Sequence, residues 1–241
     1  MIGYISSYNS FATMEGPGIR FAIFMSGCNL RCAYCHNPET WPQGKPYDSD
    51  ELYKLIVRYK PYFRNGGGVT FSGGEPLTQP DFLIELASRL KESGIHIAMD
   101  TSCGILGDKQ KRLYELCDLI LADLKFHTPQ SYNDYCKGDV FGTVIETFRY
   151  LNEKNIPVWL RTVIVPEIND TPEDIDKYYA VIKDFGNIEK YELKPFHTMG
   201  FSKYAELNIP NLLEGAEGMD MAKLDALRAR LDSLMKREIQ V

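Results

Sequence analysis

Short apolar runs and longer amphipathic stretches alternate along the chain. Six runs rich in β-branched and aliphatic residues have the length and composition of buried strands. They span residues 19–25, 68–72, 96–100, 119–125, 158–165 and 191–196. Between them, apolar residues recur at intervals of three and four positions, as on one face of a helix. This alternation predicts a parallel sheet whose strands are joined by right-handed helical crossovers.

Four apolar stripes mark the clearest of the expected helices. They are Leu52, Leu55, Ile56 and Tyr59; Leu83, Leu86, Ala87 and Leu90; Val144, Thr147, Phe148 and Leu151; and Leu224, Leu227, Leu231 and Leu234. Asp48 or Ser49 can cap the first helix, Pro80 suits the start of the second, and Gly94 suits its end. Residues 219–236 are expected to form a C-terminal helix, and residues 198–218, which lack periodicity, a long loop. Because no repeat or linker interrupts the pattern, residues 1–241 are expected to form one domain.

Composition limits the location and the partners. The 241-residue chain has 27 Lys and Arg against 33 Asp and Glu, a formal charge of −6. Because binding to nucleic acid needs clustered positive charge, we expect no nucleic-acid partner. Residues 1–7 have neither a basic start nor a long apolar core, and no apolar run reaches membrane-spanning length. We therefore expect a cytoplasmic protein with no membrane partner, in a compartment that keeps thiols reduced.

Three of the six cysteines, Cys28, Cys32 and Cys35, lie within eight residues just after the first predicted strand. Such crowding in a reducing compartment indicates metal ligation rather than disulfide bonds. Iron–sulfur clusters are usually held by four thiolates, so three would leave one iron of a four-iron cluster open to another ligand. A structural zinc site with His36 as fourth ligand is the alternative, although zinc sites commonly use paired cysteines. The other three cysteines are scattered and are expected to be buried apolar side chains.

Chemically unusual residues fall at or just after the C-terminal ends of all six predicted strands. They are the Cys28 cluster, Gly73-Gly74-Glu75, Asp100-Thr101, Asp123-Leu124-Lys125, Arg161 and His197. In parallel α/β barrels, active sites lie on the face formed by these strand ends. Asp123 and Lys125 are two residues apart and would share one face of their strand. The sequence therefore predicts a single site at this edge of the sheet.

The string Cys28-Asn-Leu-Arg-Cys32-Ala-Tyr-Cys35 resembles the CxxxCxΦC signature of the radical S-adenosylmethionine (SAM) superfamily, in which Φ is aromatic. Further strings resemble the activases of glycyl-radical enzymes, those of pyruvate formate-lyase above all. They are Glu15-Gly-Pro-Gly-Ile-Arg20, Gly67-Gly-Val-Thr-Phe-Ser-Gly-Gly-Glu75, Asp100-Thr-Ser102, Asp123-Leu-Lys125 and Lys194-Pro-Phe-His197. The matches run from the N-terminus to about Gly200. The resemblance implies the radical SAM fold, an α/β partial (β/α)6 TIM-like barrel.

The same resemblance implies the cofactors and the reaction. One [4Fe–4S] cluster would be held by Cys28, Cys32 and Cys35, with SAM at the open iron. Reductive cleavage of SAM would give methionine and a 5′-deoxyadenosyl radical, which removes a hydrogen atom from a glycine of the partner. The implied partner is pyruvate formate-lyase or a related glycyl-radical enzyme, and the implied electron donor is flavodoxin or ferredoxin.

Residue roles also follow from the resemblance. The residues implied to contact SAM are Tyr34, Cys35, His36, Asn37, Gly73, Gly74, Glu75, Asp123, Leu124, Lys125 and His197. Those implied to act near the reacting glycine are Arg161, His197 and Glu15. Those implied to hold a monovalent cation, Na⁺ or K⁺, are Asp100, Thr101 and Asp123.

Two features bear on the interaction with a partner, a departure at Glu15 and the absence of further cysteines. Glu15 stands where these activases usually carry aspartate, and the residues between Trp41 and Gly66 add no cysteines. We therefore expect no ferredoxin-like insert, which favours the pyruvate formate-lyase type. The alternatives are an activase of a different glycyl-radical enzyme, a radical enzyme acting on a small molecule or tRNA base, and a non-catalytic metal or electron-transfer protein. The last would need neither the Gly-Gly-Glu nor the Asp-Leu-Lys string.

Overall fold

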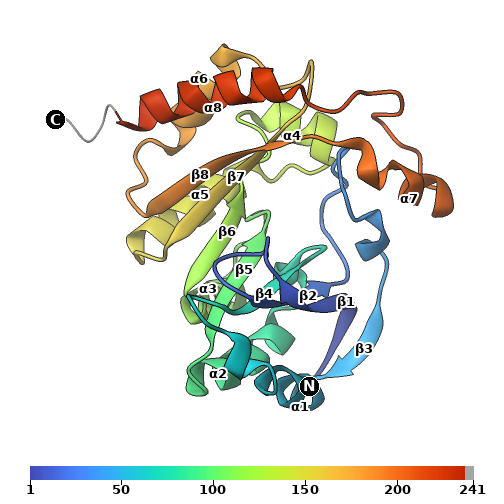
Figure 1. Cartoon of the computed structure of the whole chain (residues 1–241), viewed down its shortest axis with the longest axis vertical. Helices are drawn as coiled ribbons and strands as arrows, with labels where there is room; N and C mark the ends of the chain where they lie inside the picture. The colour runs from blue at the N-terminus through green and yellow to red at the C-terminus, as the bar shows by residue number, and fades with distance from the viewer. Residues whose placement is uncertain (237–241) are drawn as a thin grey trace.

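The computed structural model describes residues 1–236, which form a curved sheet with helices on its outer side (Figure 1). The sheet has eight strands in the order β3-β1-β2-β4-β5-β6-β7-β8. Six of them run parallel: β2 (Arg20–Met25), β4 (Gly68–Gly73), β5 (His96–Thr101), β6 (Leu119–Asp123), β7 (Val158–Ile164) and β8 (Ile188–Pro195). Because β3 and β8 form the two edges, the sheet stays open. The predicted partial (β/α)6 barrel is confirmed.

Two antiparallel strands extend the sheet beyond the sequence prediction. β1 (Ile2–Ala12) pairs with β2, and β3 (Lys45–Asp48) pairs with residues 2–5 of β1. Only Gly3, Ile5 and Ala12 of β1 are buried, and no residue of β3 is. Neither strand therefore contains the continuous apolar run by which the parallel strands were recognised.

The helices that have apolar stripes pack them on the convex side of the sheet. The helices of the described residues are α1 (Ser49–Val57), α2 (Pro80–Glu92), α3 (Asp108–Leu116), α4 (Pro129–Cys136), α5 (Phe141–Glu153), α6 (Pro172–Ile182), α7 (Phe201–Glu206) and α8 (Met221–Lys236). The predicted stripes of α2 and α5 are buried throughout. Asp48 caps α1 by accepting from the Asp50 and Glu51 N–H groups, and Pro80 opens α2. Single turns of 3₁₀ helix occur at η1 (Pro38–Thr40), η2 (Lys60–Tyr62), η3 (Pro76–Thr78) and η4 (Thr198–Gly200).

The stretch 198–218, expected to be a loop, contains η4 and the short helix α7. Six residues make fewer than two turns, which is too short for a recognisable periodic stripe. The buried side chain of α7 is Tyr204, whose ring packs edge to face on Trp41. α8 begins at Met221, two residues after the predicted start, and the last five residues of the predicted domain, 237–241, lie outside the described part. None of the helices in residues 1–236 is long and apolar enough to cross a membrane.

Candidate active site

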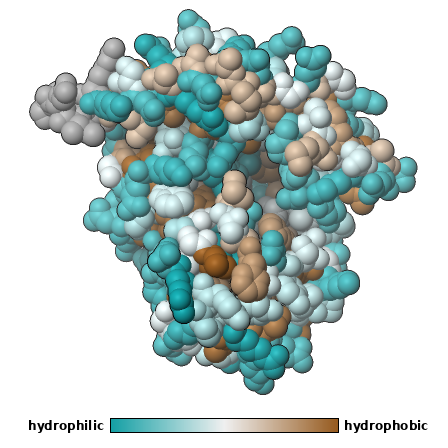
Figure 2. All heavy atoms as spheres, in the orientation of Figure 1, coloured by the Kyte–Doolittle hydropathy of each residue, from teal (hydrophilic) through white to brown (hydrophobic). Residues whose placement is uncertain are grey.

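The C-terminal ends of the parallel strands surround a cavity of about 250 Å³. Among the predicted residues that line it are Glu15, Cys28, Cys32, Tyr34, Cys35, His36, Asn37, Gly73, Gly74, Asp100, Thr101, Asp123 and Lys125. A second cavity of about 370 Å³ shares Glu15, Tyr34, His36 and Asp100 with the first, and is lined in addition by Arg161, Lys194 and His197. The face of the molecule seen in Figure 2 is hollowed near its middle. The fold thus brings together residues that are scattered over most of the sequence.

The loop that carries the three cysteines follows β2 and packs tightly on the loop after β4. The Gly27 N–H donates to the Thr40 carbonyl (2.8 Å), and the Gly27 carbonyl accepts from the Glu75 N–H (2.9 Å). A Cβ on Gly74 would lie 2.2 Å from the Gly27 carbonyl oxygen, and one on Gly73 would lie 2.3 Å from the Met25 nitrogen. Gly73 also has φ 107, a backbone conformation that favours glycine. Both glycines are therefore needed to hold the cysteine loop where it is.

The other side of the cysteine loop rests on the end of α4. The Arg31 N–H donates to the Cys136 carbonyl (2.8 Å), and the Ala33 N–H donates to the Tyr135 carbonyl (2.7 Å). Cys136 is fully buried there, and Cys103 and Cys117 are also buried, as the sequence predicts. The loop is therefore fixed from two sides by main-chain hydrogen bonds.

The three clustered thiols line the cavity and keep their protons while they are free. Burial raises the pKa of Cys28 to about 12 and that of Cys35 to about 11. A hydrogen bond with Cys136, together with burial, raises the pKa of Cys32. The Leu30 N–H donates to the Cys28 sulfur (3.4 Å), an orientation that stabilises a negative charge on sulfur. Cysteine binds a metal as the thiolate. The site therefore suits a metal centre whose affinity for thiolate is high enough to displace these protons.

The arrangement gives no support to a mononuclear zinc site. Among residues 1–236, no three His, Cys, Asp or Glu side chains are placed to hold one metal ion. A cluster makes no such demand, because its thiolates bind different iron atoms. The donor set of three thiols in one cavity suits an iron–sulfur cluster, and the zinc alternative with His36 as fourth ligand is not supported.

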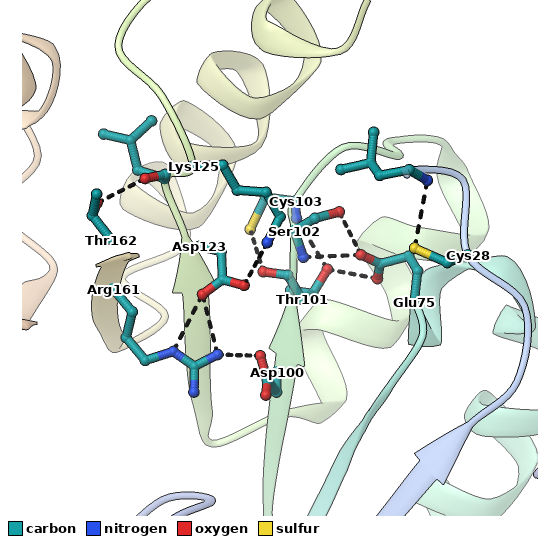
Figure 3. Close-up of polar contacts among 12 residues, drawn as sticks. Cys28, Glu75, Asp100, Thr101, Ser102, Cys103, Asp123, Lys125, Arg161 and Thr162 are labelled. Carbon is teal, nitrogen blue, oxygen red and sulfur yellow. Dashed lines mark hydrogen bonds and ion pairs between the residues drawn. The ribbon is translucent and has the colours of Figure 1, made fainter. Parts of the chain in front are cut away.

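Charged side chains form the wall opposite Cys28 (Figure 3). Nη2 of Arg161 pairs with Asp100 and lies 3.2 Å from Oδ1 of Asp123. Lys125 Nζ is 2.9 Å from Oδ2 of Asp123. Burial raises the pKa of Asp123, but Lys125 and Arg161 outweigh burial and bring the pKa below its usual value. Burial raises the pKa of Asp100 above its usual value, although Arg161 opposes this. The wall therefore presents both signs of charge.

Glu75, which was expected to face the cofactor, lies behind the wall of the cavity. Its carboxylate is fully buried. Oε1 accepts from Thr101 Oγ1 (2.7 Å) and from the Leu77 N–H (3.1 Å). Oε2 accepts from the Ser102 N–H (2.9 Å) and from Ser102 Oγ (2.5 Å), as Figure 3 shows. Because four donors converge on it, the side chain holds the turn after β5 and turns away from the cavity.

Leu124 also lies outside the two cavities. Its side chain is fully buried in the core. Its carbonyl accepts from Thr162 Oγ1 (2.7 Å), and its N–H donates to the Arg161 carbonyl (3.0 Å). Leu124 therefore joins β6 to β7 beneath Lys125.

His36 and His197 meet at the rim of the second cavity. Their rings pack edge to face with centroids 4.6 Å apart. Burial lowers the pKa of His36, and the neighbouring His197 lowers it further, which favours the neutral ring. The two histidines, 161 positions apart in the sequence, thus form one aromatic edge of the site.

The helix α7 fastens the segment after the cysteines, through residues that no sequence motif marks. Lys203 Nζ donates to the His36 carbonyl (3.1 Å) and to Asn37 Oδ1 (3.0 Å). Tyr204 Oη donates to the Cys35 carbonyl (2.9 Å). Because these contacts join residues more than 160 positions apart, periodicity and local spacing could not reveal them.

An open barrel of parallel strands with three cysteines at its C-terminal edge defines a class of protein. The chain belongs to the radical SAM superfamily, whose family model matches residues 22–179. The matched segment starts in β2, includes all three clustered cysteines and ends in α6.

Within that superfamily, the relatives of this chain include pyruvate formate-lyase-activating enzymes. The one from Clostridium pasteurianum is 43% identical over 244 residues, which cover 98% of this chain and 100% of the relative. The one from Staphylococcus epidermidis is 41% identical over 228 residues, which cover 90% of each chain. Similarity at this level over nearly the whole length places the chain in this family. Among solved structures, Streptococcus suis SuiB bound to the precursor peptide SuiA shares the fold, with a TM-score of 0.70, 16% identity, and coverage of 90% of this chain and 46% of that one.

Proposed function

We propose that the chain cleaves SAM reductively and thereby introduces a glycyl radical into pyruvate formate-lyase. The observation that carries the proposal is the cavity that Cys28, Cys32 and Cys35 share with a charged wall, inside an open barrel of this family. These three residues would hold a [4Fe–4S] cluster, which when bound supplies the electron that breaks the sulfonium–carbon bond of SAM. The protein itself has to bind, orient and shield the reactants.

The charged wall suits the zwitterionic methionyl end of SAM. Lys125 offers an ammonium group to a carboxylate, and its partner Asp123 keeps it charged in spite of burial. Gly73 and Gly74 have no side chains, so their main chain is open to the amino group of the ligand. Glu75 would act indirectly, by holding Thr101 and Ser102 in place.

Asp100, Thr101 and Asp123 are proposed to hold a Na⁺ or K⁺ ion beside the methionyl group. Both carboxylates are paired with Arg161, so the ion and the guanidinium compete for the same oxygens. Binding of the ion would therefore accompany a movement of Arg161 away from Asp100. Such a movement would direct the guanidinium toward the second cavity, which Arg161 already lines.

The nucleoside end of SAM is proposed to lie along Tyr34, His36, Asn37 and His197. Tyr34 and His36 line both cavities, so they can contact a ligand that extends from one to the other. A flat base can stack on such aromatic side chains. Lys203 holds Asn37 and the main chain of His36 and would keep this surface in shape.

The second cavity is proposed to receive the glycine of the partner, where Glu15, Arg161 and His197 line its walls. Burial and the charge of Asp100 raise the pKa of Glu15, whereas Arg161 and Lys194 oppose the rise. A carboxylate in this setting gains from hydrogen bonds donated by an incoming peptide main chain. The proposed electron donor is flavodoxin or ferredoxin. The proposed location is the cytoplasm, which would keep the six free cysteines reduced.

Electron paramagnetic resonance tests the proposed function. Protein reconstituted with iron and sulfide without oxygen is mixed with SAM, a reductant and pyruvate formate-lyase. The expected result is a glycyl-radical signal in the partner that is absent when Cys28 is replaced by Ser. A signal that arises only with a different glycyl-radical enzyme would overturn the assignment of the partner, and the absence of a signal with any of them would overturn the function.

A further inference from the structure

The loop between β1 and β2, residues 13–19, carries Glu15 to the junction of the two cavities. None of its seven residues is buried, and Met14 is 76% exposed. Gly16 and Gly18 have φ angles of 118 and 64, which glycine adopts without strain. Because the loop buries no side chain and contains two flexible residues, its shape has to be fixed by contacts with the sheet.

One such contact reaches the main chain of Glu15 itself. Thr70 Oγ1 lies 2.6 Å from the Glu15 carbonyl oxygen and 2.9 Å from Nε of Arg20. Thr70 and Arg20 are both fully buried, on the neighbouring strands β4 and β2. Arginine can only donate hydrogen bonds, so the hydroxyl accepts from Arg20 and its single proton points to Glu15. The direction of both hydrogen bonds is therefore fixed.

Arg20 is in turn held by residues around the first residues of β4 and β5. Nη1 donates to the Gly66 carbonyl (2.9 Å), and Nη2 donates to the Val69 carbonyl. Nη1 also lies 3.1 Å from Nδ1 of His96, which has to accept because the guanidinium has no acceptor. Burial lowers the pKa of Arg20 to about 10, so it remains charged at neutral pH. Arg20 also donates to the Pro17 and His96 carbonyls (3.5 Å each), so this buried charge uses its donors and joins the backbone around residues 17, 66–69 and 96.

We propose that Arg20 and Thr70 are positioning residues that hold the loop 13–19 so that Glu15 faces the glycine-containing segment of a partner protein. The inference rests on the proposed function and names the residues by which that site receives a polypeptide. Thr70 lies in β4 before the glycines that line the first cavity, and it lines neither cavity. Loss of its hydroxyl therefore releases the main chain of Glu15, whereas the contacts of the cysteine loop and of the charged wall remain.

The test compares Thr70→Val, which lacks the hydroxyl, with Thr70→Ser, which keeps it, and with Thr147→Val. Thr147 is a matched control because it is fully buried and donates to a carbonyl, that of Cys103 (3.0 Å), away from the loop. In the cluster-free protein, Thr70→Val is expected to speed hydrogen–deuterium exchange in residues 13–19, whereas the two other variants leave it unchanged. In the reconstituted enzyme, Thr70→Val should raise the KM for the partner about tenfold, the effect of one lost hydrogen bond. Formation of 5′-deoxyadenosine without the partner should be unchanged.

Two results would overturn the inference. One is wild-type exchange in residues 13–19 together with a wild-type KM in Thr70→Val. The other is an equal change in Thr147→Val, which would show a general loss of stability. Failure of the proposed function would appear separately, as wild-type enzyme that forms no glycyl radical. The exchange experiment needs neither cluster nor partner, so it tests the hold on the loop whether or not the proposed function is correct.

Discussion

Arg161 and Asp123 are opposite each other on the neighbouring strands β7 and β6, with Nη2 of Arg161 3.2 Å from Oδ1 of Asp123. The same nitrogen pairs with Asp100 of β5, so one guanidinium bridges two partly buried carboxylates, of which Asp123 also pairs with Lys125. These three residues join the sheet across its middle at the depth of the predicted site. The stability of the open barrel and the chemistry of the site therefore depend on the same charges.

Replacement of Arg161 by Met should destabilise the protein strongly. The substitution leaves the partly buried Asp100 without its cation and Asp123 with Lys125 alone, and loss of one partner of a fully buried ion pair costs about 3–5 kcal/mol at most. Urea unfolding of the cluster-free protein measures it. Arg230→Met is the control, because Arg230 pairs with Asp176 at the surface and its loss should change the stability far less. Equal effects of the two substitutions would show that the buried charges are not a stabilising unit.

Glu75→Gln should destabilise the turn after β5. The amide nitrogen would face two of the four donors that now point at the carboxylate, which leaves buried groups unpaired at a cost of about 1–3 kcal/mol. The free energy of unfolding of the cluster-free protein reports the loss. Glu92→Gln, on the exposed side of α2, should leave that free energy nearly unchanged. If Glu75→Gln is as stable as the wild type, the carboxylate does not hold the turn.

Lys203→Met should weaken the binding of SAM. The lysine fixes the main chain of His36 and the side chain of Asn37, so its removal loosens the surface proposed for the nucleoside. A loss of one to two hydrogen bonds corresponds to a roughly threefold to tenfold higher Kd. Anaerobic equilibrium dialysis of the reconstituted protein measures the Kd. Lys60→Met, which removes an exposed contact to the Ser93 carbonyl, serves as control and should bind SAM as the wild type does.

Single replacements of Cys28, Cys32 or Cys35 by Ser should prevent assembly of the cluster. The hydroxyl of serine is a poor ligand for iron compared with a thiolate. Bound iron and visible absorption after anaerobic reconstitution report the loss. Cys117→Ser changes a thiol at the end of α3 that donates to the Leu113 carbonyl, far in sequence from the loop, and should leave the iron content unchanged. Full iron content in any of the three loop variants would contradict the assignment of ligands.

The sequence predicted those parts of the molecule that depend on local pattern. The six parallel strands follow from apolar runs, and the stripe in α2 follows from helical spacing that the structure buries completely. The convergence of cysteines, glycines and charges at one edge follows from the rule that parallel strands end on the same face. β1 and β3 were not predicted because few of their residues are buried, and α7 was not predicted because it has only six residues.

The parts that the sequence could not predict depend on pairs of residues far apart in the chain. Nothing local in Gly74-Glu75-Pro76 shows that the carboxylate turns toward Ser102 and away from the cavity. The hydrogen bond of Tyr204 to the Cys35 carbonyl and that of Thr70 to the Glu15 carbonyl join distant segments in the same way. Such contacts are set by tertiary packing, which a single sequence does not display.

The central claim is that three thiolates hold a cluster at which SAM is cleaved. The most direct measurement is the formation of methionine and 5′-deoxyadenosine by the reduced, anaerobically reconstituted protein, with the Cys28→Ser variant beside it. We predict equal amounts of the two products from the wild type and none from the variant. A wild-type protein that carries iron and binds SAM but yields neither product, or a variant that yields both, would contradict the account.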